Sequence, residues 1–116
     1  MGRRVGHALG DVDSIQVPAL CDLEIASVIR RGILAGLLTP DQAKATLRSL
    51  LNLPIVRHTH ELLLSRVLAL RDNFTAYDAS YVALAEALGL PMLTTDVRLT
   101  RAVASLGHID LIVLPD

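Results

Sequence analysis

The stretch from Asn73 to Ala102, NFTAYDASYVALAEALGLPMLTTDVRLTRA, carries the strongest fold signal in the chain. Its first half is rich in Ala and Leu and stops at Gly89, a residue type that commonly lies just beyond the end of a helix. The next segment, PMLTT at 91–95, is typical of a buried strand. The predicted helix is apolar on every side, yet one carboxylate, Asp78, stands at its head.

Short strands and helices also alternate outside this stretch. The predicted strands are residues 15–18, 54–57, 91–95 and 110–114, and the other predicted helices are 19–31, 40–51, 60–71 and 96–107, with Gly32 and Gly36 interrupting the chain after the first of them. Nearly continuous apolar strands separated by helices favour a central, mostly parallel sheet covered on both faces. The 116 residues, 52% of them hydrophobic, are predicted to form a single α/β domain spanning 1–116.

Composition excludes several classes of protein. The net charge of -1 provides no general attraction for nucleic acid, so contacts with RNA would have to come from local Arg clusters. One Phe, two Tyr and no Trp argue against a passive RNA-binding module that stacks bases on aromatic side chains. Cys21 has no partner for a disulfide, and no apolar run is long enough to cross a membrane. A soluble protein of the reducing cytoplasm is expected.

Three acidic residues stand in unusual surroundings. Glu24 has mostly apolar neighbours three and four positions away on its helix, so it is expected to point inward, where a carboxylate needs a partner. The alternative is a Glu at the edge of the helix that reaches solvent or pairs with Arg30 or Arg31. Asp78 and Asp96 also have an ordinary explanation, because carboxylates stabilise the first turn of a helix.

Taken together, the three acids favour a metal site. In a parallel α/β sheet, the ends of strands and the starts of the following helices gather at one edge, where such folds bind ligands. Converging carboxylates require a cation, and oxygen ligands select Mg²⁺ or Mn²⁺. Such an ion supports phosphodiester hydrolysis. The His residues, all assigned to the surface, show no HExxH spacing, and neither a P-loop nor a GxGxxG or GxSxG motif is present.

The same segments resemble the PIN-domain ribonucleases, and more narrowly the VapC toxins of toxin–antitoxin pairs. The segment VPALCDLEIASVIRR is similar to the family segment that carries the active-site Glu, which falls on Glu24. The block FTAYDASYVALAEALGLPMLTTDVRLTRA is similar to the family's most recognisable region, and its two Asp positions fall on Asp78 and Asp96. The resemblance implies a three-layer α/β/α domain and an endoribonuclease dependent on Mg²⁺ or Mn²⁺. It also implies a homodimer and inhibition by a small VapB-type antitoxin whose tail covers the active site.

The chain departs from the family pattern at its start. Family members begin with a hydrophobic strand, central in the sheet and ending in an Asp, that lies before the position equivalent to Arg3. Asp11 and Asp13 lie in a turn-like segment, GDVDS, and are poor substitutes for that Asp. The expectation is therefore a PIN-like domain that lacks its first strand. Either the start was assigned about 15–20 residues too late, or the protein is a decayed copy; the otherwise intact motifs favour a late start.

These observations assign candidate roles. Asp78 and Asp96 are predicted metal ligands, and Glu24 is a ligand or orients the attacking water, with Thr95 in support. Arg98, Arg101, Arg30 and Arg31 are candidates for contact with RNA phosphates, although each is also explained as a solvated surface charge. One alternative is a catalytically inactive protein that only dimerises or binds an antitoxin. A flavodoxin-like phosphate receiver fits less well, because the only Lys, Lys44, lies within a predicted helix.

Overall fold

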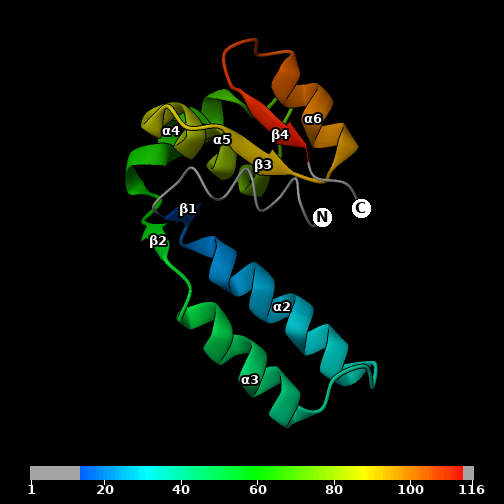
Figure 1. The fold of residues 1–116 in the computed structure, drawn as a ribbon. Helices are drawn as coiled ribbons and strands as arrows, with labels where there is room; N and C mark the ends of the chain where they lie inside the picture. The colour runs from blue at the N-terminus through cyan, green and yellow to red at the C-terminus, as the bar shows by residue number, and fades with distance from the viewer. Residues whose placement is uncertain (1–13, 114–116) are drawn as a thin grey trace. The chain divides into compact units, whose positions relative to one another are not determined.

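The computed structural model describes residues 14–113, and its elements follow the predicted order of strands and helices (Figure 1). They are β1 (Ile15–Pro18), α2 (Leu20–Leu34), α3 (Pro40–Leu51), β2 (Ile55–His58), the 3-10 turn η1 (Glu61–Leu63), α4 (Leu64–Ala69), α5 (Ala76–Leu88), β3 (Met92–Thr94), α6 (Val97–Ala104) and β4 (Leu111–Val113). The described chain forms two compact units, residues 14–58 and residues 59–113. Asp11, Asp13 and His7 lie outside the described residues.

In the first unit, strands β1 and β2 pair in parallel, and α2 and α3 connect them (Figure 1). The register runs from Ile15 opposite Ile55 to Pro18 opposite His58. Parallel strands cannot be joined by a tight turn, so the two helices serve as the crossover between them. The ladder is extended at its end, where the Ala19 N–H donates to the His58 carbonyl at 2.8 Å.

Helix α3 begins where the sequence predicts, because Thr39 caps it. The Thr39 hydroxyl accepts a hydrogen bond from the Gln42 N–H at 3.1 Å, and the Gln42 side chain accepts one from the Thr39 N–H at 2.9 Å. This reciprocal capping box satisfies two backbone donors that a helix start otherwise leaves unpaired. Pro40 at the first helical position loses nothing, because its missing N–H would have had no partner in the helix.

The second unit contains the hydrophobic core, and α5 lies within it. Ala79, Val82 and Val103 have no exposed surface, and the remaining residues of this core come from η1, α4, the segment between α4 and α5, α5 and β3. Gly89 ends α5 in the left-handed conformation at φ 64°, which glycine adopts without steric cost. Strands β3 and β4 then pair in parallel, with Met92 opposite Leu111, and α6 connects them.

The structure confirms an α/β fold with parallel strands, and it corrects several details. Within residues 14–113 the strands form two parallel ladders of two strands each, one in each unit. Helix α2 continues through Gly32 to Leu34, because one glycine inside a helix costs only about 1 kcal/mol. A Cβ at Gly32 would approach Leu38 Cδ1 to 2.9 Å, so this glycine leaves room for the Leu38 side chain. The helix predicted at 60–71 begins instead as a 3-10 turn.

In the part of the chain that the structure describes, no helix is both long and apolar enough to cross a membrane.

Two valines of α6 test the position of the core. Val103 is fully buried, whereas Val97 on the same helix is 61% exposed. Replacing Val103 by Ala removes two buried methyl groups and leaves a cavity, so V103A is expected to lower the free energy of unfolding by about 2–3 kcal/mol. V97A is the matched control and should change it by less than about 0.5 kcal/mol. Urea denaturation followed by circular dichroism measures both, and equal effects would contradict this placement of the core.

Candidate functional site

A pocket in the second unit brings together two of the three predicted acidic residues. It has a volume of about 180 Å³ and is lined by Asn73, Phe74, Thr75, Asp78, Asp96, Arg98, Leu99 and Ala102. Pockets that enclose drug-sized ligands usually have volumes of about 300–1,000 Å³, so this pocket is small. It therefore suits a phosphate group or a hydrated ion, rather than the enclosure of a large organic ligand.

Asp78 lies in the first turn of α5 and is half-buried. Thr75 caps this helix, since its hydroxyl accepts a hydrogen bond from the Asp78 N–H at 3.1 Å. The carboxylate of Asp78 is therefore not needed as the cap, and it makes no hydrogen bond or ion pair within residues 14–113. The two residues that follow, Ala79 and Ser80, are buried, so the core fixes the backbone that carries Asp78.

Asp96 follows β3 and caps α6, as the ordinary explanation from the sequence predicts. Its Oδ1 accepts hydrogen bonds from the N–H of Arg98 at 2.9 Å and of Leu99 at 3.3 Å. Its own N–H donates to the Thr94 hydroxyl at 3.0 Å, and the Thr94 residue is buried. Both capping bonds use Oδ1, so Oδ2 is left for a ligand. Capping and metal binding are therefore compatible roles for this carboxylate.

Of the residues predicted to contact phosphate, Arg98 lines the same pocket as the two acids. Its N–H donates to Asp96, while its guanidinium makes no ion pair within the described chain. Arg101 and Thr95 are exposed and do not line the pocket. Arg30 and Arg31 are exposed on α2, in the other unit.

The prediction that Glu24 points inward is wrong, because Glu24 is exposed in the structure. Helix α2 has no buried residue, and Leu23 and Val28 are 75% and 58% exposed. The spacing of apolar residues indicates which side chains share a face of a helix, but it does not indicate what covers that face. Glu24 belongs to the unit of residues 14–58, and the two acids that line the pocket, Asp78 and Asp96, belong to the unit of residues 59–113.

The residues of the pocket fit a hard divalent cation in part. Within residues 14–113, no three His, Cys, Asp or Glu side chains gather closely enough to hold a metal ion. Asp78 nevertheless supplies a carboxylate with both oxygens uncommitted within residues 14–113, and Asp96 supplies its Oδ2. Mg²⁺ is commonly held by one or two carboxylates and retains several waters, for which the pocket has room. The oxygen-only donor set argues against zinc.

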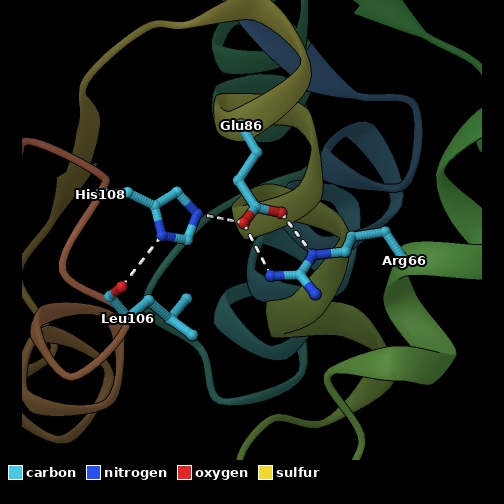
Figure 2. A network of polar contacts seen from close by, with 4 residues as sticks. All are labelled: Arg66, Glu86, Leu106 and His108. Atoms are coloured by element: carbon cyan, nitrogen blue, oxygen red, sulfur yellow. Dashed lines mark hydrogen bonds and ion pairs between the residues drawn. The ribbon is translucent and has the colours of Figure 1, made fainter.

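A second polar network, which the sequence did not reveal, joins α4, α5 and the α6–β4 loop (Figure 2). The Arg66 guanidinium donates two hydrogen bonds to the Glu86 carboxylate, at 2.8 and 2.9 Å. His108 Nε2 also bonds the Glu86 carboxylate, and His108 Nδ1 lies 3.0 Å from the Leu106 carbonyl. Glu86 is the one acid in the apolar stretch that follows Asp78 in α5, and that isolation was the available signal.

The geometry of this network favours a protonated His108. Both partners of the imidazole are acceptors, so both ring nitrogens must carry a proton for the two hydrogen bonds to form. The Leu106 carbonyl, followed by Glu86, raises the pKa of His108 above its usual 6.5, while the nearby Arg66 opposes this. The hydrogen bond from Arg66 and that from His108 lower the pKa of Glu86, against the effect of burial. The prediction that the His residues lie on the surface is confirmed only in part, because His58 and His60 are half-buried.

Comparison with known proteins identifies the family of this chain. The PIN domain family model matches residues 3–104, and the chain belongs to this family. Among characterised relatives, it is similar to ribonuclease VapC3 of Mycobacterium tuberculosis, with 42% identity over 89 residues, 77% of this chain and 65% of the relative. It is similarly related to ribonuclease VapC1 of the same organism, at 43% over 86 residues, 73% of this chain and 65% of the relative.

A third relative, ribonuclease VapC12 of the same organism, is 31% identical over 100 residues, 86% of this chain and 78% of the relative. The resemblance of the sequence to VapC-type PIN ribonucleases is thus confirmed. The chain spans about two thirds of the length of VapC3 and VapC1.

The charge on His108 makes the stability of the second unit depend on pH. Because folding raises the pKa of His108, the stabilisation is complete below pH 6.5 and is lost as the pH rises through the raised value. The melting temperature should therefore fall from pH 6 to pH 8. H108Q should lower it at pH 6 and flatten this dependence, whereas H108K keeps a cation and should remain stable across the range. A pH dependence that H108Q leaves unchanged would contradict the assignment.

Proposed function

We propose that this protein is a metal-dependent endoribonuclease toxin that hydrolyses RNA phosphodiester bonds. The observation that carries the proposal is the pocket in which Asp78, Asp96 and Arg98 meet at the starts of two helices. Membership of the PIN domain family and similarity to proteins named ribonuclease VapC support it. The free carboxylate oxygens suit a cation, and the guanidinium suits the phosphate of a substrate.

The proposed cofactor is Mg²⁺ or Mn²⁺, held by Asp78 and by Oδ2 of Asp96. We propose Glu24 as a third ligand or as the residue that orients the attacking water, on the basis of the family motif alone. Such an ion lowers the pKa of a bound water and stabilises the charge that develops on the leaving oxygen. The hydrogen bonds from the N–H groups of Arg98 and Leu99 to Oδ1 of Asp96 fix the carboxylate before the ion arrives.

Arg98 is the strongest candidate for binding the scissile phosphate. It lines the pocket, and its guanidinium has no competing carboxylate partner in the described chain. A guanidinium can donate two parallel hydrogen bonds to one phosphate. Arg101, Arg30 and Arg31 are proposed as further contacts along the RNA, and Thr95 as a supporting hydrogen-bond donor.

The proposed partners are a VapB-type antitoxin, which inhibits the enzyme in the cytoplasm, and a second copy of the chain. Exposed apolar side chains on α2 and α3 are consistent with covered surfaces in the cell, since Leu23, Leu34 and Leu51 are 75%, 69% and 60% exposed. Exposed apolar surface of this kind often marks a site of protein–protein interaction.

Amide substitutions test the two carboxylates without altering the shape of the side chain. D78N and D96N should each lower the rate of cleavage of single-stranded RNA by at least about 100-fold, because each loses a charged metal ligand. Asn caps a helix as well as Asp does, so D96N separates the charge from the capping role. D72N is the matched control, since Asp72 is exposed nearby and does not line the pocket.

The measurement is the cleavage of a labelled oligonucleotide by purified protein with Mg²⁺ or Mn²⁺. D72N should cut at the wild-type rate, and unaltered cleavage by D78N would contradict the assignment. Wild-type protein that cuts no RNA with either ion, yet still binds an antitoxin, would favour the alternative of an inactive binding protein.

Metal removal is expected to stop the reaction. EDTA should abolish cleavage, and Mg²⁺ or Mn²⁺ added in excess of the chelator should restore it, because the pocket supplies only oxygen ligands. Full activity in EDTA would contradict metal dependence. The same RNA digested by an unrelated, metal-independent ribonuclease provides reference products. Cleavage in EDTA that yields these products identifies a contaminating enzyme.

A further inference from the structure

Asn73 is a polar residue of the pocket with no assigned role. It lies in the segment between α4 and α5 and lines the same pocket as Asp78, Asp96 and Arg98. Its neighbour in the pocket, Thr75, is already engaged as the cap of α5. The side-chain amide of Asn73 is therefore the neutral polar group of the pocket that is left without a structural task.

The backbone of Asn73 is held firmly while its side chain is uncommitted. The Leu70 carbonyl accepts hydrogen bonds from the N–H of Asn73 at 3.2 Å and of Phe74 at 3.1 Å. Phe74 is only 8% exposed and anchors the segment in the core. The Asn73 amide makes no hydrogen bond within residues 14–113, and the residue is exposed. A fixed backbone with a free amide is suited to ligand recognition, because only the side chain loses conformational freedom on binding.

The chemistry of the pocket narrows the choice of ligand group. The carboxylates of Asp78 and Asp96 accept hydrogen bonds only, and the Arg98 guanidinium donates only. An amide does both, so it matches a group that is itself donor and acceptor. The ribose 2′-hydroxyl is such a group, it lies beside the scissile phosphate, and it is the group by which proteins distinguish RNA from DNA.

We infer that Asn73 binds the ribose 2′-hydroxyl next to the scissile phosphate and so determines the preference for RNA over DNA. This inference rests on the proposed function, because it assumes that RNA enters this pocket. The expected contribution is that of one hydrogen bond between neutral groups, which corresponds to about 2- to 10-fold in binding or rate.

The test combines removal of the Asn73 side chain with removal of the ribose 2′-hydroxyl. The substrates are a labelled RNA oligonucleotide and the same oligonucleotide with a single 2′-deoxyribose at the cleaved position. Wild-type protein should cut the RNA about 2- to 10-fold faster. N73A should cut both at the slower rate, because the amide and the hydroxyl form one interaction and their losses are not additive. N73D should be slower still on both, since its charge repels the phosphate.

Binding of uncleaved oligonucleotides in EDTA, followed by fluorescence anisotropy, separates this inference from the proposed function. Here the fully RNA and fully DNA forms are compared, and N73A should lose the preference for RNA. If no protein cleaves but N73A loses this preference, the nuclease proposal fails while the role of Asn73 stands. The inference is overturned if N73A retains the preference for RNA in both assays. It is also overturned if the wild-type protein shows no preference for RNA. N52A, which alters an exposed Asn in the other unit, is the control and should behave as wild type.

Discussion

The burial of α5 on nearly all sides is the constraint on which the candidate site depends. A helix with six buried residues, from Ala79 to Ala85, has few positions open to solvent along its length. A charged side chain is costly in such a helix unless it lies at an end or has a partner. Asp78 lies at the amino end and lines the pocket, and Glu86 lies near the other end and binds Arg66 and His108. The core thus dictates where the two acids of this helix stand.

The second carboxylate of the pocket, that of Asp96, is positioned by local hydrogen bonds. Strand β3 ends at Thr94, and the buried hydroxyl of this residue accepts the Asp96 N–H. Asp96 then caps α6 through Oδ1 alone. One side chain therefore starts a helix and still offers an oxygen to the pocket. Helix capping and metal binding are competing explanations of Asp96 when only the sequence is considered, but capping uses Oδ1 and leaves Oδ2 for the metal binding that we propose.

The sequence predicted the parts of the structure that depend on local signals. The helix ending at Gly89, the cap at Asp96 and the helix beginning at Pro40 all follow from side chains within a few positions of the residues they affect. The hydrogen bond that Glu86 accepts from Arg66 spans 20 residues, and its bond with His108 spans 22. No local sequence pattern predicts either of them. The exposure of Glu24 was missed for a related reason, because periodicity defines a face of α2 without showing what covers it.

The central claim is that Asp78 and Asp96 hold one divalent ion. Titration of ¹⁵N-labelled protein with substoichiometric Mn²⁺ tests it directly, because the paramagnetic ion broadens the amide signals of residues close to it. The account predicts that the signals of Asp78 and of Asp96 and Arg98 broaden together at the same low Mn²⁺ concentration. Broadening centred elsewhere, or at only one of the two acids, would contradict it.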